Sequence, residues 1–349
     1  PSGATAADSS RIREVWADKI PGGGRSGATI KIDSTTTLGT GTLVIKSRSV
    51  TTQGTPEAPS ADYELLEQIG QGGMGVVYSA RQANFNRMVA VKMLRPDAGG
   101  RNKRTEFVAE AVTTGDLDHP NIVPVYDLGT NEEGALFYAM KCVQGTPWDG
   151  VLGQKPLTEN VEILLRVADA IAFAHASGVI HRDLKPENVM LGSFGEVLVM
   201  DWGLAIRFRV EPDGRIRSSG ASMGGTPAYM APELVLGPTE RIGPAADIYL
   251  LGAILYAILT GYPPHTGSTP MECLYAAADN VIRPTDASGE LLDVALKAMA
   301  TKPADRYKSV PALQKAIRDY QSHSESIALL DNARKQLTEA EKSGDYQHY

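Results

Sequence analysis

Eight consecutive residues, His181 to Asn188, constrain this chain more than any other stretch. They read His-Arg-Asp-Leu-Lys-Pro-Glu-Asn and follow an apolar lead-in. Asp183 can act as a general base, Lys185 can neutralise phosphoryl charge, and the amide oxygen of Asn188 suits a hard cation such as Mg²⁺. The stretch therefore predicts a catalytic loop, although its charge density would also fit an ordinary surface loop. The rest of the chain has to distinguish these two interpretations.

Composition limits the alternatives without naming a function. The chain has 349 residues, 42% of them hydrophobic, enough for one large or two modest cores. A net charge of -7 disfavours nucleic-acid binding, which needs a clustered basic surface. The two cysteines, Cys142 and Cys273, have no metal-ligand or redox spacing and predict reduced thiols.

Membrane and targeting signals are also absent from the sequence pattern. The most apolar run, 248–259, is much shorter than the roughly 20 residues that span a bilayer, and it predicts a buried helix. The chain begins with Pro1 and shows no signal peptide, so it resembles a piece of a longer protein. We expect a cytoplasmic domain without a membrane segment, and leave open an anchor elsewhere in a longer parent.

Residues 1–62 differ in amino-acid composition from the rest of the chain. They are rich in Gly, Ser, Thr, Ala and Pro, which is typical of a flexible tail. Two short β-like patches stand out, at Ala28 to Ile32 and at Leu43 to Lys46, with turn-forming glycines nearby. We expect a mostly flexible segment, in which the two patches could form a weak hairpin.

A glycine-rich turn follows at 70–75, where Gly-Gln-Gly-Gly-Met-Gly leads into Val76-Val77-Tyr78. A dinucleotide-binding turn would need a helix directly after the glycines. Here β-branched and aromatic residues follow at strand spacing, which favours a β-hairpin whose backbone N–H groups can fold over a phosphate chain.

One lysine and one glutamate are expected to form a buried pair. Lys92 is the only charge in the apolar strand 88–94, and Glu110 lies beside the apolar face of a helical pattern over 104–114. A buried charge needs a counter-charge, so we expect the two to meet. Two further strands, 122–126 and 135–143, complete a small lobe with five strands and one helix.

A second pair is predicted after the catalytic loop. Two short strands, 189–191 and 197–200, flank a turn and should form a hairpin. The hairpin brings its two ends together, so Asn188 and Asp201 should lie side by side. An amide oxygen and a carboxylate make a plausible two-ligand Mg²⁺ site.

In combination these features resemble a Hanks-type Ser/Thr protein kinase from about Tyr63 to Tyr320. The motifs occur in the family's order: Gly70, Gly72, Gly75 and Val77, then Val89 to Lys92, Glu110, His181 to Asn188, Asp201 to Gly203, and Ala231 to Glu233. The run Gly-Gly-Met-Gly-Val-Val-Tyr is similar to the glycine loop of bacterial members.

The resemblance implies an α+β, two-lobed kinase fold. Residues 63–143 would form a small five-stranded N-lobe with one main helix, and 144–320 a larger, mostly helical C-lobe. Residues 1–62 would precede this kinase domain and 321–349 would form a C-terminal helical extension.

The resemblance also implies a mechanism, phosphoryl transfer from ATP to a protein hydroxyl with Mg²⁺. The roles it assigns are phosphate binding by Lys92, orientation of that lysine by Glu110, γ-phosphate contact by Lys185, proton acceptance by Asp183, and Mg²⁺ binding by Asn188 and Asp201. The implied nucleotide site is lined by Ile69, Gly70, Gly72, Gly73, Gly75, Val77, Ala90, Lys92, Met140, Lys141, Val143 and Met190. Asp247 would anchor the catalytic loop, and Arg306 would pair with Glu233.

Three departures from the family pattern stand out. Trp202 replaces the usual Phe after the metal-binding Asp, and Lys141 replaces an acidic residue common at the adenine-binding hinge. The activation segment, Leu204 to Met230, is long and basic, and we expect it to be loop-like. Arg182 in similar kinases binds an activation-segment phosphate. The candidate phosphorylation sites are Ser218, Ser219, Ser222 and Thr226.

Two functions of different class follow. The first is an active protein kinase, because every catalytic position is filled. Lys185 and Thr226 favour specificity for Ser and Thr. We expect protein substrates and autophosphorylation in the activation segment. The second, prompted by Trp202 and Lys141, is a pseudokinase scaffold that binds nucleotide or proteins without turnover. A helical apolar stripe over 327–340 further suggests that one or both flanks pack on the kinase or on a second copy, giving a homodimer.

Overall fold

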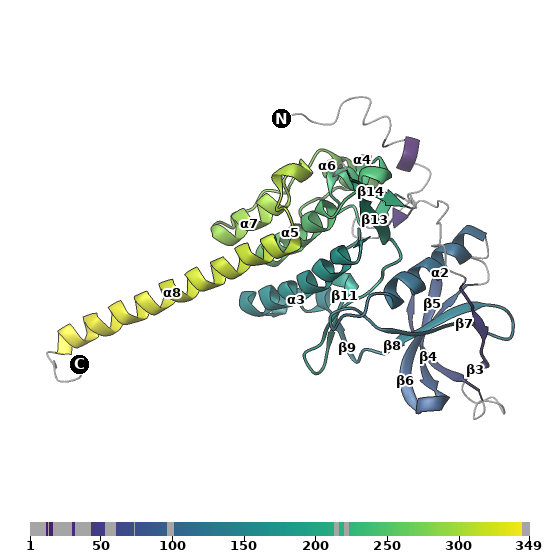
Figure 1. Cartoon of the computed structure of the whole chain (residues 1–349). Coiled ribbons are helices and arrows are strands. Elements are labelled where there is room, and N and C mark those ends of the chain that lie inside the picture. Colours follow the sequence, from purple (N-terminus) through teal and green to yellow (C-terminus); the bar gives the residue numbers. More distant parts are fainter. Residues whose placement is uncertain are drawn as a thin grey trace.

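The computed structural model describes residue 12 and residues 14–16, 30–31, 43–52, 61–72, 74–95, 101–212, 216–219 and 223–343. It has two lobes, a curled sheet with one helix and a larger helical part (Figure 1). The predicted two-lobed α+β fold is therefore confirmed.

The N-lobe sheet contains five antiparallel strands, as expected, but the strand predicted over 122–126 forms later, over 125–130. They are β4 (Tyr63–Gln71), β5 (Gly75–Gln82), β6 (Arg87–Leu94), β7 (Val125–Thr130) and β8 (Leu136–Lys141). Their order is β7-β8-β6-β5-β4, so β6 with its lysine lies at the centre. Helix α2 (Arg101–Gly115) packs on β7 and β8, and Phe107 and Ala111 bury its inner face in the lobe's core.

Two more strands extend this sheet, and both come from the segment predicted to be a tail. Strand β2 (Lys46–Ser47) pairs in parallel with β7 at one edge. Strand β3 (Val50–Thr52) pairs in parallel with β4 at the other. Only two residues separate β2 from β3, so this short piece of chain joins the two edges of a curled seven-stranded sheet. We call residues 46–52 the clasp.

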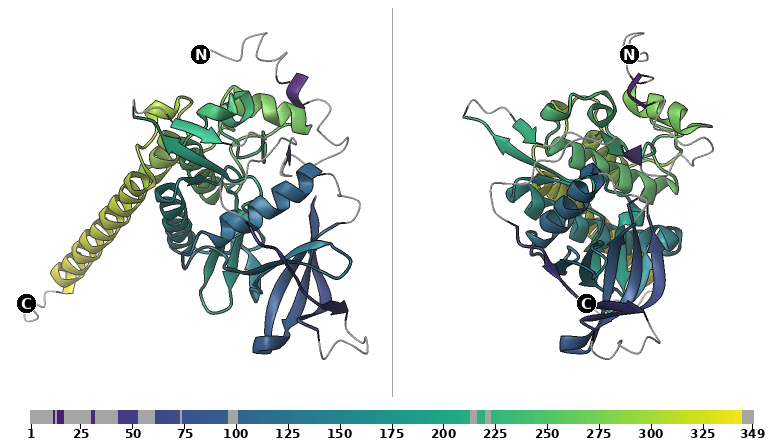
Figure 2. Two further views of the ribbon diagram at one scale, coloured as in Figure 1. Left: turned by 45° about the vertical axis from the view of Figure 1, so that its right-hand side comes forward. Right: turned by 90° about the vertical axis from the view of Figure 1, so that its right-hand side faces the viewer.

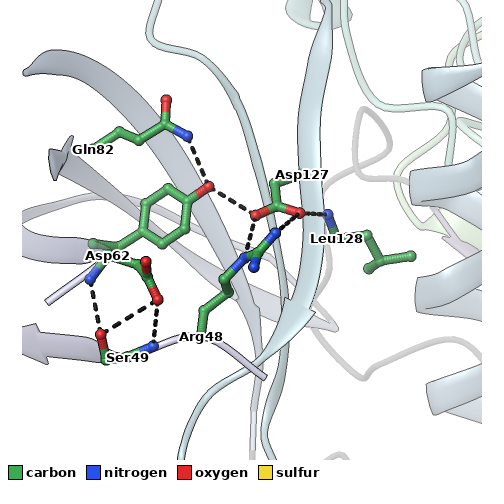
Figure 3. A network of polar contacts seen from close by, with 7 residues as sticks. Arg48, Ser49, Asp62, Gln82, Asp127 and Leu128 are labelled. Carbon is green, nitrogen blue, oxygen red and sulfur yellow. Dashed lines mark hydrogen bonds and ion pairs between the residues drawn. The ribbon is translucent and has the colours of Figure 1, made fainter. Parts of the chain in front are cut away.

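A polar network holds the clasp in place (Figure 3). The guanidinium of Arg48 donates to both carboxylate oxygens of Asp127 on β7, with Nε 2.8 Å from Oδ2. Asp127 also accepts from the Tyr63 hydroxyl of β4, at 3.0 Å. Ser49 donates its N–H to Asp62 just before β4. The network ties together the same two edges as the backbone pairing.

Where the two N-terminal patches are described, they pair with other strands and not with each other, so the hairpin alternative is wrong. Strand β1 (Ile30–Lys31) pairs with β15 (Gly224–Gly225) in the activation segment, and only the last residue of the second patch enters β2. The composition of the segment hid these contacts, because each involves only two or three residues.

The C-lobe is built around one helix that is apolar on all sides. This helix, α5 (Ala245–Thr260), is buried along most of its length, as expected for a uniformly apolar pattern. The other C-lobe helices are α3 (Leu157–Ala176), α4 (Pro232–Leu236), α6 (Pro270–Ala278), α7 (Glu290–Ala298) and α8 (Val310–Ser343). The shorter strands are β9 (Gly145–Pro147), β10 (Val179–Ile180), β11 (Val189–Gly192) and β12 (Val197–Val199).

The activation segment is more regular than expected. Strands β13 (Ile206–Val210) and β14 (Ile216–Ser219) form an antiparallel hairpin, and β13 also pairs with β10. The loop prediction was therefore wrong for these residues. The sequence does carry a signal, because Ile206, Phe208 and Val210 alternate with arginines and Pro212-Asp213-Gly214 is a turn sequence.

Helix α8 runs without a break through the expected domain end at Tyr320. Figure 2 shows its last part extending away from the C-lobe. From Ser322 to Glu339 every described side chain is exposed, including Ile327, Leu330 and Leu337. The apolar stripe finds no partner within the described part of this chain, and its packing on a second copy stays a prediction. Among the described residues, no helix combines the length and apolarity needed to cross a membrane.

Candidate active site

The catalytic loop is held from below by a buried carboxylate. Asp247 on α5 is fully buried and accepts the backbone N–H groups of His181 and Arg182, each at 2.8 Å. It also bonds His175 Nε2 on α3 at 2.8 Å. Burial alone would raise the pKa of Asp247, but the His175 hydrogen bond, nearby histidine charge and the backbone donors lower it. An ionised anchor thus fixes the loop, in the contact expected from the resemblance.

Asp183 is positioned by side chains from both directions along the chain. Its Oδ1 accepts from the Thr226 hydroxyl at 2.7 Å, and its Oδ2 lies 3.3 Å from Asn188 Nδ2. The same amide nitrogen donates to the Asp183 carbonyl at 2.8 Å. A threonine hydroxyl thus lies where a general base could receive a proton.

Asn188 and Asp201 lie at the paired ends of the predicted hairpin. Asn188 directly precedes β11, Asp201 follows β12, and Met200 N–H, between β12 and Asp201, donates to the Asn188 carbonyl at 2.8 Å. Because Asn188 uses its amide nitrogen toward Asp183, its amide oxygen is directed elsewhere. Desolvation by the surrounding protein acts to raise the pKa of Asp201, although the residue is exposed at the surface of the site; Lys92, the Gly203 N–H and neighbouring cations outweigh it and lower the pKa. An ionised carboxylate and an amide oxygen are a donor set that fits Mg²⁺.

Lys92 and Glu110 form the expected pair between β6 and α2. Lys92 Nζ lies 2.6 Å from Glu110 Oε1, and the Glu110 side chain is almost fully buried. Burial would lower the pKa of Lys92, but Glu110 and the neighbouring Tyr138 and Asp201 raise it well above its usual value. The lysine is therefore a fixed positive charge pointing at the site.

Sequence reasoning missed Tyr138 as a third member of this group. Its hydroxyl donates to Glu110 Oε1 at 2.7 Å, the same oxygen that binds Lys92. Tyr138 is the register partner of Lys92 across β6 and β8. No local pattern could reveal it, because the two residues meet only through pairing of strands separated in the sequence.

The glycine turn connects β4 and β5 above this pair. Gly72 N–H donates to the Gly75 carbonyl at 2.9 Å. A Cβ at Gly75 would lie 2.6 Å from the Met93 carbonyl oxygen, so only glycine fits there, whereas Gly72 has open space around it. Gly73 lies outside the described residues. Gly75 is thus required by packing, and Gly72 leaves room for a ligand.

The walls expected around adenine come from both lobes. Ala90 and Met140 are buried in the N-lobe core and Val77 packs against it; Met190, on β11, is half-buried at the C-lobe side. Of the others, Ile69 is exposed at the end of β4, and Gly70 and Val143 are half-buried. Apolar side chains on two sides with a charged group at one end is a composition that suits a nucleotide.

The two unusual residues avoid the catalytic positions. Lys141 directs its ammonium to Glu196 in the β11–β12 turn, at 2.5 Å. Trp202 is buried and packs on His181, with ring centroids 4.6 Å apart. Its indole N–H has no hydrogen-bond partner among the described residues.

The candidate phosphorylation sites lie in different settings. Ser218 on β14 is buried and donates to the Thr239 carbonyl at 2.6 Å, while Thr226 is engaged by Asp183. Of Ser219 only the backbone, in β14, is described, and Ser222 lies outside the described residues. Arg182 is buried and its Nε donates to the Leu204 carbonyl at 2.7 Å; burial lowers the pKa of Arg182 to about 10.

A further ion pair closes the C-lobe. Arg306, fully buried, binds both carboxylate oxygens of Glu233 at 2.6 and 2.8 Å. It also donates to the carbonyls of Ala300 and Ala245. The expected contact between Arg306 and Glu233 is therefore present, and it ties α4 to the segment before α8.

A glycine turn above a lysine–glutamate pair, with an anchored aspartate loop beneath it, defines a protein kinase. A family model described as "Protein kinase domain" matches residues 63–318, so the chain belongs to this family. The serine/threonine-protein kinase PknD of Chlamydia trachomatis (serovar D) is 36% identical in an alignment 297 residues long that covers 74% of this chain and 31% of PknD. PknB of Mycobacterium tuberculosis, also a serine/threonine-protein kinase, is 37% identical in an alignment 272 residues long that covers 74% of this chain and 43% of PknB.

These likenesses confirm the interpretation as a Hanks-type Ser/Thr kinase similar to bacterial members. The chain spans less than half the length of the two relatives. Members of the family use ATP and a divalent metal in general.

Proposed function

We propose that this domain transfers the γ-phosphoryl group of ATP to Ser and Thr hydroxyls of proteins. The observation that carries the proposal is the hydrogen bond from the Thr226 hydroxyl to Asp183 Oδ1, 2.7 Å long. This hydrogen bond places an alcohol oxygen against the Asp183 carboxylate, which belongs to the anchored catalytic loop. The acceptor hydroxyl of a substrate needs the same kind of contact to lose its proton.

The surrounding charges support phosphoryl transfer over other uses of such a carboxylate. Lys92, held by Glu110, would bind the α- and β-phosphates, and Lys185 would contact the γ-phosphate. Asn188 and Asp201 would hold Mg²⁺. Bound ATP and Mg²⁺ supply the transferable phosphoryl group and neutralise its charge. The residues themselves position the reactants, which is the main source of rate in this reaction.

The test is phosphorylation of a generic basic protein by the purified chain with ATP and Mg²⁺. Asp183→Asn should lower the rate at least about 100-fold, the typical contribution of a general base. Asp286→Asn, an exposed C-lobe aspartate, is the matched control and should change nothing. Equal rates for Asp183→Asn and the unmodified chain would refute the proposal.

The scaffold alternative has no specific observation in its favour. It was prompted by Lys141 and Trp202, and neither disturbs a catalytic side chain: Lys141 pairs with Glu196, and Trp202 packs behind the loop on His181. The lysine–glutamate pair that the proposed phosphoryl transfer requires is also formed.

We also propose autophosphorylation in the activation segment, at one or more of Ser218, Ser219 and Ser222. Ser218 would first have to leave its bond to Thr239, so the β13–β14 hairpin must open for it to react. A phosphate there could recruit arginine through charge-assisted hydrogen bonds. Mass spectrometry of the active enzyme tests this, and finding all three serines unmodified in fully active protein would count against it.

A further inference from the structure

The N-terminal segment contacts both lobes and the activation segment between them. Ile12 and Trp16 are buried in the C-lobe core, β1 pairs with β15, and the clasp pairs with both edges of the N-lobe sheet. Figure 1 shows the short N-terminal helical stretch, in purple, beside α4. Nothing in the catalytic mechanism requires any of these contacts.

The first contact is an aromatic anchor. Residues 12 and 14–16 are helical, with Ile12 and Trp16 fully buried and the intervening Glu14 exposed. The Trp16 indole N–H donates to the Val235 carbonyl of α4, at 3.4 Å. A buried tryptophan whose N–H reaches a backbone acceptor is typical of a specific docking contact.

The second contact lies beside the catalytic residue. Ile30 and Lys31 pair antiparallel with Gly225 and Gly224, and in the described part of the chain β1 is the only strand paired with β15. The next residue, Thr226, is the one that bonds Asp183. Strand β15 therefore ends one residue before the threonine whose hydroxyl contacts the catalytic carboxylate.

A protein substrate would need the same edge. To place a hydroxyl against Asp183, an extended segment must pass the residues just before Thr226, where backbone pairing is available to it. Strand β1 already makes this pairing, and two segments cannot occupy one edge. A side chain at Gly225 would be strained, because its φ is +146° and its Cβ would lie 3.0 Å from the Met230 side chain.

The third contact fixes the other end of the segment. The clasp begins at Lys46 and is tied to the N-lobe sheet by strand pairing and by the Arg48–Asp127 ion pair. With Trp16 held on the C-lobe and the clasp on the N-lobe, the strand between them is tethered at both ends. Tethering makes its binding to β15 intramolecular, so weak pairing suffices.

We propose that β1, anchored through Trp16 on one side and the clasp on the other, acts as an intramolecular strap that competes with protein substrates for the β15 edge. The inference rests on the proposed kinase function. The strap leaves the nucleotide side of the site untouched, because its described contacts are to α4, the C-lobe core and β15. Release of Trp16 should therefore improve substrate binding without changing ATP binding.

The expected change in substrate affinity depends on the fraction of molecules in which the strap covers the β15 edge. If the strap covers the edge nine-tenths of the time, the apparent affinity for a substrate is about tenfold below its intrinsic value. We expect Trp16→Ala in the full chain to lower KM for a generic basic protein by about five- to tenfold. KM for ATP should stay the same, Trp16→Phe should lie between the two, and Glu14→Ala should resemble the unmodified chain.

A second pair of variants avoids the buried anchor, whose loss could destabilise the fold. Ile30→Pro and Lys31→Pro, tested separately, remove one N–H each from β1, and at least one should weaken pairing with β15. That variant should lower KM for the protein substrate as Trp16→Ala does, with an unchanged melting temperature. An unchanged KM for the protein substrate in Trp16→Ala and in both proline variants would overturn the strap.

Hydrogen exchange separates failure of the strap from failure of the kinase function. In Trp16→Ala the peptide containing residues 223–231 should exchange faster than in the unmodified chain and in Glu14→Ala. If no variant shows Asp183-dependent transfer, the proposed function fails. The strap is then tested only by the hydrogen exchange of residues 223–231. Equal exchange of 223–231 in Trp16→Ala and the unmodified chain would refute it.

Discussion

Lys92 and Glu110 lie 2.6 Å apart where β6 faces α2, and the glutamate side chain is almost fully buried. Tyr138 donates to the same glutamate oxygen, so three polar groups share one enclosed position. A network of this kind is stable while complete and costly when one member is removed, because the others stay buried without a partner.

This arrangement separates the catalytic from the structural role of Lys92. Lys92→Met should abolish transfer, by at least about 100-fold, and also lower the free energy of unfolding by about 3 kcal/mol, since Glu110 is left without its counter-charge. Adding Glu110→Leu should restore part of the stability and none of the activity. Urea unfolding measures the free energy of unfolding, and the transfer assay measures the activity. If the double variant regained transfer, another lysine would have to hold the phosphates.

Two of the buried tryptophans, Trp202 and Trp148, should respond differently to the same substitution. Trp202 N–H has no partner among the described residues, so Trp202→Phe removes an unsatisfied donor and should change stability by less than about 1.5 kcal/mol. Trp148 N–H donates to buried Asn160 at 2.8 Å, so Trp148→Phe should cost about 1–3 kcal/mol more. Thermal melting compares them. Trp202→Phe should keep its kinase activity, and loss of that activity would show that the indole has a catalytic task.

The clasp should be more important for stability than its length suggests. Asp127 accepts from Arg48, Tyr63 and the Leu128 N–H, and Asp127→Asn keeps the shape while removing the charge. Because the Arg48–Asp127 pair is partly exposed, we expect a loss of about 1–2 kcal/mol and faster hydrogen exchange in β2 and β3.

Arg209→Ala, which breaks an exposed pair with Glu211, is the control for the clasp and should cost at most about 0.5 kcal/mol. If Asp127→Asn were as mild as this control, the clasp would be held by backbone pairing alone.

What could be predicted depended on how locally each feature is encoded. The catalytic loop, the Lys92–Glu110 pair and the Asn188–Asp201 neighbours follow from short patterns, since each rests on one hairpin or one lone charge. Tyr138 could not be predicted, because it depends on the register of distant strands. The Thr226 bond to Asp183 joins residues 43 apart in the sequence, and no periodicity reports such a contact.

The N-terminal segment shows a different limit. Averaged over 62 residues, Gly, Ser and Thr dominate and predict a tail. In the described part of this segment the contacts depend above all on Trp16 and Arg48, and composition gives single anchors almost no weight. An isolated Trp in a polar segment, with an apolar residue four positions before it, is the local signal that indicates such an anchor.

The last prediction concerns acid stability and His265. Its side chain is fully buried, with Nδ1 2.9 Å from the Val281 carbonyl and Nε2 2.7 Å from the Tyr249 hydroxyl. Burial lowers the pKa of His265 to about 4, although its backbone hydrogen bonds act to raise it. The ordinary histidine value is about 6.5, so between about pH 6.5 and 4 the unfolded chain binds a proton that the folded chain does not. The stabilising contribution of neutral His265 is therefore complete above about pH 6.5. It falls as the pH drops toward 4, by up to about 3 kcal/mol for a difference of about 2.5 pH units between the two pKa values.

The variant His265→Gln should be less stable than the unmodified chain at pH 7 but should lose this pH dependence. The variant His323→Gln, at an exposed histidine, should keep it. The measurement is urea unfolding at intervals from pH 7 to 4.5, taken as the difference from the unmodified chain. The difference removes the contribution of His119, whose pKa is also lowered by burial. A slope in His265→Gln equal to that of the unmodified chain would mean that other groups titrate in this range and that His265 stays neutral in both states.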